Sequence, residues 1–211
     1  MVLIVDYGAG NLRSVCKAVE RVGASPLVTH DPAAVAGAEA LILPGVGAAA
    51  DTMAHLNRRG LVEPLRRYLA SGRPFLGVCM GLQALLTGSE EGGWHPCLDV
   101  VPGRVVRLSA GLTVPHMGWN RVHRRTDHPI FDGIPDGEHF YFVHSYYCAP
   151  TDEGCVVATT DYGGPFPSVL GRDNWVGTQF HPEKSGQAGV RLYANFLDWA
   201  RRPSVTPAAL R

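Results

Sequence analysis

Short apolar runs alternate with helical periodicity through the first half of the chain. The runs that predict strands lie at residues 2–5, 26–29, 40–43 and 75–78. Residues 12–22 repeat apolar side chains at helical spacing and stop at Gly23, and a second helical stretch at residues 51–69 is broken by Gly60 and Pro64. Strands that alternate with helices in this way predict an α/β fold, a mostly parallel sheet flanked by helices.

The second half of the chain is richer in strands. Its short strand-like runs, separated by Gly, Pro and Asp turns, lie at residues 100–108, 111–115, 120–123, 141–148, 155–160, 168–170 and 175–179. One last amphipathic helix is expected at residues 188–200. There is no repeat and no linker, so we expect one domain over residues 1–201. The remaining residues, 202–211, are expected to form a loosely ordered tail.

Composition narrows the class of protein. The chain of 211 residues has a formal net charge of zero, which does not favour nucleic acid or an anionic membrane as a partner. The one basic cluster, Arg121, His123, Arg124 and Arg125, is expected to be a solvated loop. Five cysteines without a CxxC pair argue against a disulfide framework or a structural zinc. The N-terminus lacks the pattern of a signal peptide, and no apolar run is long enough to span a membrane, so a cytoplasmic setting is expected.

The most informative chemistry lies around Cys79. Gly77 and Gly81 flank it at two positions on each side, an apolar strand leads into it and an apolar helix is expected to follow. This is the pattern of a nucleophile elbow, in which the flanking residues approach too closely to carry a Cβ. The other interpretation is an inert core cysteine, which the strand–turn–helix context disfavours. The remaining cysteines are expected to be structural: Cys16 in an apolar stripe, Cys97 in a loop, and Cys148 and Cys155 in or near strands.

A base and an orienting carboxylate follow at His181 and Glu183. With Cys79 they make a Cys-His-Glu triad the leading hypothesis. In this arrangement the imidazole moves protons and the carboxylate fixes its tautomer.

Two glycine-rich turns have alternative interpretations. Residues 6–11 follow the first strand as a dinucleotide-binding loop would, and Asp31 lies where a ribose-binding acid is expected. Arg13 replaces the third glycine of that fingerprint, which argues against a dinucleotide site. The second turn, residues 44–47, is either a plain tight loop or a backbone that presents an N–H to a nearby oxyanion.

These motifs together resemble a known family. The chain resembles the triad-type (class I) glutamine amidotransferases, and among them the glutaminase subunits of imidazole glycerol phosphate synthase of histidine biosynthesis. The segments that carry the resemblance are residues 6–12, 44–47, 77–83, 115–120, 141–146 and 179–185. One departure is Ala48-Ala49-Ala50, where the family usually has an aromatic residue just after the loop.

The resemblance implies a flavodoxin-like fold with a nucleophile elbow and a set of roles around it. Cys79, His181 and Glu183 would be the catalytic triad, and the backbone N–H groups of Val46 and Met80 would form the oxyanion hole. The residues expected to line the glutamine pocket are Gly47, Gln83, Glu91, Ser145 and Tyr146. Without the resemblance, Gln83 would be interpreted as an exposed helix residue and Glu91 as a solvated loop acid.

The resemblance also implies a partner, since the chain has no domain that could use ammonia. That partner would be a cyclase subunit with a (β/α)₈ barrel, and neither a cofactor nor a metal is expected. The positions expected to face the cyclase are Asn11, Trp119, Asn120, Tyr141 and Lys184. The alternatives are a glutaminase subunit of another amidotransferase, a cysteine hydrolase of the same fold, and a non-catalytic binding module.

Overall fold

A large mixed sheet forms the centre of the molecule. The structure, a computed structural model, describes residues 1–202, within which nine strands join in the order β2-β1-β3-β4-β13-β12-β11-β8-β9. The strands that run parallel are β2 (Leu27–Thr29), β1 (Val2–Val5), β3 (Ala40–Gly45), β4 (Phe75–Cys79) and β13 (Trp175–Thr178). The antiparallel strands, all from the second half of the chain, are β12 (Pro165–Arg172), β11 (Val156–Asp161), β8 (His116–Arg124) and β9 (Glu138–His144).

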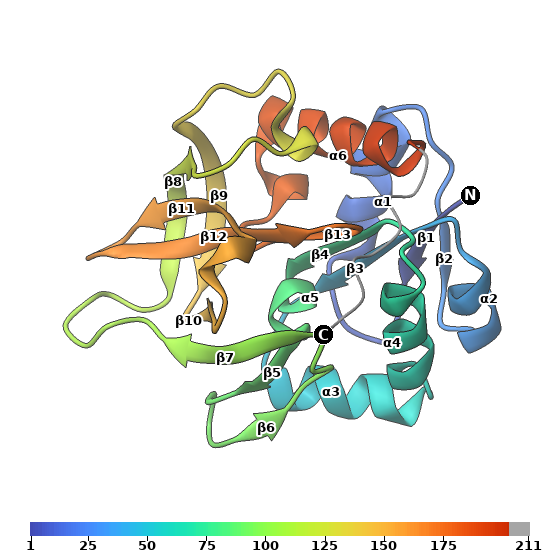
Figure 1. The fold of residues 1–211 in the computed structure, drawn as a ribbon, viewed down its shortest axis with the longest axis horizontal. Helices are drawn as coiled ribbons and strands as arrows, with labels where there is room; N and C mark the ends of the chain where they lie inside the picture. Colours follow the sequence, from blue (N-terminus) through green and yellow to red (C-terminus); the bar gives the residue numbers. More distant parts are fainter. Residues whose placement is uncertain (203–211) are drawn as a thin grey trace.

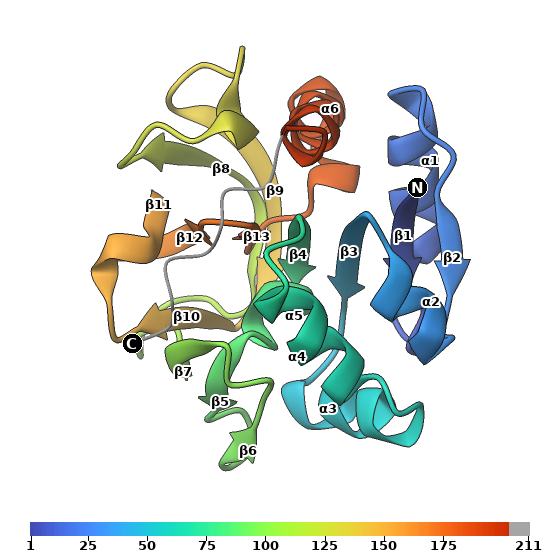
Figure 2. The ribbon, with the colours of Figure 1, turned by 45° about the vertical axis from the view of Figure 1, so that its right-hand side comes forward.

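Helices cover both faces of the parallel half, which confirms the α/β class (Figures 1 and 2). On one face lie α1 (Leu12–Arg21) and α6 (Gly186–Ala200); on the other lie α2 (Pro32–Gly37), α3 (Ala49–Arg58) and α4 (Val62–Ala70). Side chains that alternate along each strand pack on opposite faces. Leu41 belongs to the core under α3 and α4, whereas Ile42 belongs to the core under α1 and α6. Both faces of β3 and β4 are therefore buried, which explains their continuous apolar runs.

A second, smaller sheet lies beyond the end of β4. Within the described residues it has four strands, β10 (Tyr146–Pro150), β7 (Val101–Arg107), β5 (Leu86–Ser89) and β6 (His95–Pro96). The short helix α5 (Met80–Gln83) leads from β4 into β5. Leu82 and Leu86 share the core that α3 and α4 cover, so this sheet is anchored beside the elbow.

Several sequence-based boundaries were wrong. Residues 141–148 form two strands that part at Ser145, since β9 pairs in the large sheet and β10 in the small one. Residues 111–115 form turns before β8 and no strand. The stretch at residues 51–69 is two helices, α3 and α4, separated at Gly60; Pro64 lies in the first turn of α4, where its missing N–H is tolerated. The sequence-based prediction also missed α2 and β5.

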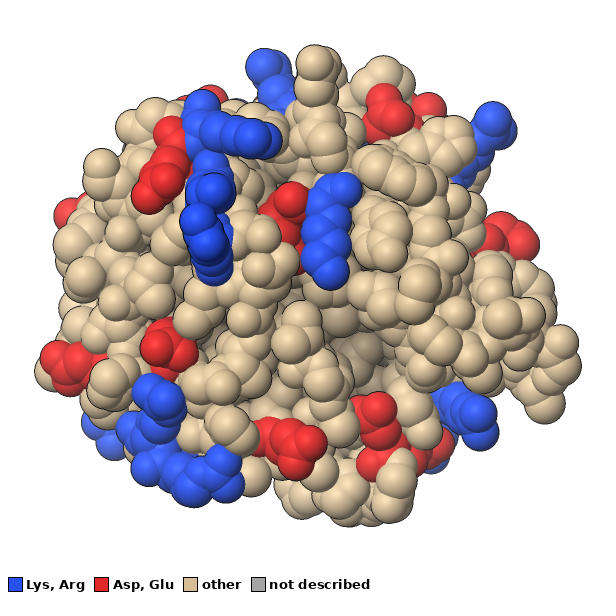
Figure 3. Space-filling model, turned by 180° about the vertical axis from the view of Figure 1, so that it is seen from behind, with Lys and Arg blue, Asp and Glu red and all other residues tan. Residues whose placement is uncertain are grey.

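The charged surface agrees with the zero net charge. Acidic and basic side chains are interspersed on the face shown in Figure 3. The basic cluster lies at the end of β8 rather than in a loop. Arg124 lies 3.9 Å from Asp136, and Arg125 lies 3.3 Å from Glu153, so exposed carboxylates offset it.

Two further expectations concern the chain as a whole. None of the helices among residues 1–202 has both the length and the apolar character needed to cross a bilayer. The expected loose tail, residues 202–211, lies outside the described residues except for Arg202. The domain boundary at residue 201 stays a prediction.

Candidate active site

The turn at Cys79 has the geometry of a nucleophile elbow. Cys79 ends β4 with a φ of +53° and a ψ of −106°, a conformation that side chains other than glycine rarely adopt. A Cβ on Gly77 would lie 2.7 Å from the Gly81 carbonyl oxygen, and a Cβ on Gly81 would lie 1.8 Å from the Leu43 carbonyl oxygen. Glycine is therefore required on both sides of Cys79. The residue that excludes a side chain at Gly81 is Leu43 of β3, and not Gly77.

The helix that is expected to follow Cys79 is present but is only one turn long. α5 has only four residues before the chain turns into β5. One turn aligns few peptide dipoles, so this helix contributes little to stabilising a thiolate at Cys79. Other donors near the sulfur therefore gain importance.

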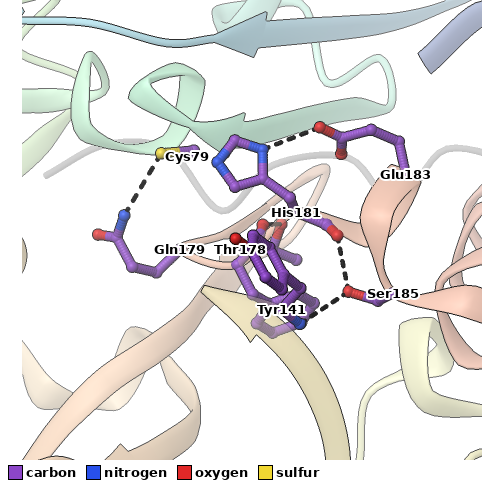
Figure 4. Close-up of polar contacts among 8 residues, drawn as sticks. Cys79, Tyr141, Thr178, Gln179, His181, Glu183 and Ser185 are labelled. Carbon is purple, nitrogen blue, oxygen red and sulfur yellow. Dashed lines mark hydrogen bonds and ion pairs between the residues drawn. The ribbon is translucent and has the colours of Figure 1, made fainter. Parts of the chain in front are cut away.

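His181 and Glu183 lie where the chain leaves β13 for the one-turn helix η3 (Pro182–Lys184). The His181 Nδ1 atom lies 2.8 Å from Glu183 Oε1, and each side chain is only 2% exposed. Figure 4 shows the imidazole between the Cys79 sulfur and the Glu183 carboxylate. Burial would lower the pKa of His181, but its contacts with Cys79 and Glu183 outweigh burial and raise it to about 10. These two contacts therefore favour the protonated form of the imidazole.

Ser185 holds this segment against β9. Its hydroxyl donates to the His181 carbonyl at 2.6 Å and accepts from the Tyr141 N–H at 3.0 Å. The His181 N–H in turn donates to the Tyr141 carbonyl at 2.9 Å. The backbone on both sides of the imidazole is thereby fixed relative to the large sheet (Figure 4).

A cavity of about 160 Å³ opens beside the elbow. Cys79 and His181 line it, and so do the residues expected in the pocket and the oxyanion hole: Val46, Gly47, Met80, Gln83, Glu91, Ser145 and Tyr146. The structure therefore brings together every residue predicted for the site except Glu183, which lies behind His181. Gln83 is buried rather than exposed, which is the outcome that the family resemblance implied.

Glu91 has a structural contact as well as a place in the cavity wall. Its Oε2 accepts, at 2.9 Å, from the N–H of Ala49, which is the first residue of α3. Glu91 therefore caps α3 from a distant part of the chain. The run Ala48-Ala49-Ala50 departs from the family pattern, but Ala49 is buried, so this segment is packed and hydrogen-bonded.

Sequence reasoning missed Gln179, which is fully buried. Its Nε2 lies 3.7 Å from the Cys79 sulfur (Figure 4). Its Oε1 accepts from Gln83 Nε2 at 3.0 Å. The available signal was its place in the same motif as His181, two residues earlier. Motif position alone does not reveal this contact, because it depends on how β13 lies against β4.

The residues predicted to face a partner differ in their surroundings. Trp119 and Tyr141 are opposite each other on β8 and β9 with ring centroids 6.1 Å apart, and Lys184 Nζ lies 5.8 Å from the centre of the Tyr141 ring. Trp119 is 56% exposed. Asn120 differs, since its side-chain amide donates to the Asp161 carbonyl at 2.9 Å and to a buried histidine. Asn11 lies just before α1.

The competing interpretations lose support. Asp31 caps α2 by accepting from the Ala33 N–H, so it is used structurally. Burial raises the thiol pKa at each of the remaining cysteines, Cys16, Cys97, Cys148 and Cys155. Inert thiols are what the sequence predicted for these four.

Comparison with known proteins agrees with this geometry. Residues 3–199 match the family described as glutamine amidotransferase class-I. The HisH subunit of imidazole glycerol phosphate synthase from Syntrophotalea carbinolica is 54% identical, with 94% of this chain and all of the relative covered. The HisH subunit from Chloroflexus aurantiacus is 52% identical, with 95% and 96% covered. The chain therefore belongs to the class-I glutamine amidotransferases and, among them, to the HisH subunits of imidazole glycerol phosphate synthase.

Solved structures show the same fold. A crystal structure of a glutamine amidotransferase aligns with a TM-score of 0.75 at 22% identity and covers 95% of this chain and 99% of the other. The PurLQS structure from Thermotoga maritima aligns with a TM-score of 0.73 at 18% identity and covers 94% and 97%.

Proposed function

We propose that the chain is the glutaminase subunit of an imidazole glycerol phosphate synthase, which hydrolyses glutamine and delivers the ammonia to a cyclase subunit. The observation that carries this proposal is the Cys79, His181 and Glu183 constellation beside a cavity of about 160 Å³. The HisH relatives, about half identical over nearly the whole chain, support the same function.

The reaction is nucleophilic catalysis on an amide. The Cys79 thiolate attacks the side-chain carbonyl of glutamine, and the tetrahedral intermediate carries its negative charge on oxygen. Protonated His181, the form that its contacts favour, gives its proton to the departing nitrogen, so ammonia leaves and a glutamyl thioester remains. The neutral imidazole then takes a proton from water, which attacks the thioester and releases glutamate and Cys79. Glu183 holds the ring in the required tautomer throughout.

The backbone N–H groups of Val46 and Met80 are proposed to stabilise the oxyanion. Gly47, Gln83, Ser145 and Tyr146 are proposed to contact the substrate in the cavity. Glu91 is proposed to attract the substrate ammonium, because a carboxylate in the cavity wall complements a positive charge.

Use of the ammonia requires a second protein. The partner proposed is a cyclase with a (β/α)₈ barrel, docked over the surface formed by Trp119, Tyr141 and Lys184. Trp119 is 56% exposed and lies against the half-buried Tyr141, and aromatic side chains are enriched at protein interfaces. Asn11, just before α1, remains a proposed contact with the cyclase. Asn120 is better explained as a structural residue, since its amide is already used within the subunit. The proposed location is the cytoplasm, where free thiols stay reduced.

A cysteine hydrolase of the same fold is the remaining alternative. The two functions are separated by assaying the chain with and without a cyclase subunit that binds it. We expect glutamate release from glutamine, rising when the cyclase and its nucleotide substrate are present, together with formation of the cyclised imidazole product. Hydrolysis of peptides or esters with no activity on glutamine would contradict the proposal.

A further inference from the structure

We propose that Gln179 is a further catalytic residue: it donates an amide N–H to the Cys79 sulfur, and Gln83 fixes its orientation. The inference rests on the proposed function only in taking Cys79 as the nucleophile. Gln179 is fully buried, its Nε2 lies 3.7 Å from the sulfur, and this distance suits an N–H···S hydrogen bond. The question is which end of the amide faces the sulfur, and the Tyr146 carbonyl answers it through Gln83.

A series of hydrogen bonds from Asn120 on β8 holds the Tyr146 carbonyl in place. Two backbone groups fix the Asn120 side-chain amide at its start. The Arg121 N–H can only donate, and it donates to Asn120 Oδ1 at 2.8 Å. The Asp161 carbonyl can only accept, and it accepts from Asn120 Nδ2 at 2.9 Å. The second N–H of Asn120 therefore faces His116 Nε2, 3.2 Å away, and that nitrogen must be an acceptor.

Two buried histidines continue this series of hydrogen bonds from Asn120 to the Tyr146 carbonyl. His116 and His144 are direct partners in the β8–β9 ladder, and His116 Nδ1 lies 2.9 Å from His144 Nε2. Since His116 Nε2 accepts, Nδ1 carries the proton and donates to His144. His144 Nδ1 then donates to the Tyr146 carbonyl at 2.9 Å. A second proton on either ring would meet another N–H, and burial lowers the pKa of both to about 4.

The Tyr146 carbonyl sets the polarity at the cavity. It is an acceptor only, so the Gln83 atom 2.9 Å away is the amide nitrogen. The second N–H of Gln83 donates to Gln179 Oε1 at 3.0 Å. With its oxygen used by Gln83, Gln179 presents its NH₂ group to Cys79. The reverse orientation would place two NH₂ groups against each other and an oxygen against the sulfur.

This arrangement favours the reactive form of Cys79. A thiolate is a hydrogen-bond acceptor, so a fixed N–H donor stabilises it relative to the thiol. The one-turn helix α5 supplies little of this stabilisation. Gln179 is uncharged, so it supports the thiolate without competing with His181 for the role of acid.

The test measures alkylation of Cys79 by iodoacetamide as a function of pH, with the Cys79 peptide quantified by mass spectrometry. In Gln179→Met, which keeps the length of the side chain and removes the donor, we expect the pH midpoint to rise by about one unit. The alkylation rate at neutral pH should fall about tenfold. Gln179→Glu places an oxygen at the sulfur and should shift the midpoint further in the same direction.

Ser168→Ala is the matched control. Ser168 is buried beside Gln179, its carbonyl accepts the Gln179 backbone N–H at 2.8 Å, and its hydroxyl has no hydrogen-bond partner within residues 1–202. This variant should keep the wild-type alkylation profile. A wild-type profile in folded Gln179→Met would overturn the proposal and leave Cys79 as the nucleophile. Because alkylation needs no glutamine, the profile is informative even if the proposed glutaminase function fails.

Discussion

Gly45 of β3 lies directly opposite Cys79 of β4 in the parallel ladder. The residues that follow them, Val46 and Met80, therefore leave adjacent strand ends side by side. A Cβ on Gly45 would lie 2.5 Å from the Met80 Cβ, which shows how closely the loop approaches the elbow. This register brings two backbone segments to the wall of the cavity, which is why their N–H groups are the ones proposed to stabilise the oxyanion.

Val46→Pro removes one of these N–H groups. We expect glutamine turnover to fall by roughly 10²–10³-fold, the usual loss for one oxyanion donor. Val46→Ala keeps the N–H and should lose much less. Synthesis from added ammonia by the complex with its cyclase should persist in both variants. Near-normal glutamine turnover in a folded Val46→Pro complex would show that this N–H is not used.

Glu183→Gln removes the carboxylate that helps to hold His181 protonated. The pKa of His181 should fall from about 10, because the opposite charge at 2.8 Å is lost. Glutamine turnover should fall by roughly 10²–10⁴-fold, since an amide can hold the ring in the wrong tautomer. NMR titration of the His181 ring measures the first effect and a glutamate-release assay the second. Glu63→Gln, the same change at an exposed ion pair with Arg66, should alter neither.

Acid should destabilise the fold between about pH 6.5 and pH 4. Burial lowers the pKa of His116, His128 and His144 from 6.5 to about 4. The unfolded chain therefore takes up protons first as the pH falls, and the stabilisation present above pH 6.5 is lost as the pH approaches 4. The urea midpoint measured against pH should decline over this interval.

His128→Asn tests one part of that decline. His128 Nδ1 accepts from the Ile130 N–H at 3.1 Å, and an asparagine oxygen can replace it without titrating. The decline should be shallower in this variant. An unchanged slope would show that His128 does not contribute to acid unfolding.

Gly81→Ala tests the close approach of the elbow to β3. The new Cβ would lie 1.8 Å from the Leu43 carbonyl oxygen, so we expect a loss of at least about 2 kcal/mol in the free energy of unfolding. Gly37→Ala is the matched control, because nothing lies within 4 Å of its Cβ position. Similar urea midpoints for both variants would contradict the close packing seen here.

The sequence predicted best what depends on local spacing. Gly77 and Gly81 around Cys79 predicted the elbow. The constraint on Gly77 is local, since its Cβ would meet Gly81, whereas the constraint on Gly81 comes from Leu43 of β3. The apolar runs of β3 and β4 predicted a sheet flanked by helices. The spacing of His181 and Glu183 predicted an interacting pair, because two residues so close in sequence can meet within one turn of the backbone.

What the sequence did not predict depends on contacts between distant segments. The Gln179–Cys79 contact requires β13 beside β4, and the His116–His144 pair requires the register of β8 and β9. The break at Ser145 was missed because the apolar pattern continues across it, although the chain passes from one sheet to another. α2 was missed because its one buried side chain, Val35, gives no periodicity.

The most direct measurement compares the two nitrogen sources in a complex of Cys79→Ala with the cyclase subunit. Synthesis from glutamine should fall on the order of 10⁴-fold or more, because the thiol is the proposed nucleophile. Synthesis from added ammonia should continue, because that chemistry belongs to the partner. Product formed from glutamine at a substantial rate by the Cys79→Ala complex would contradict the assignment of the active site.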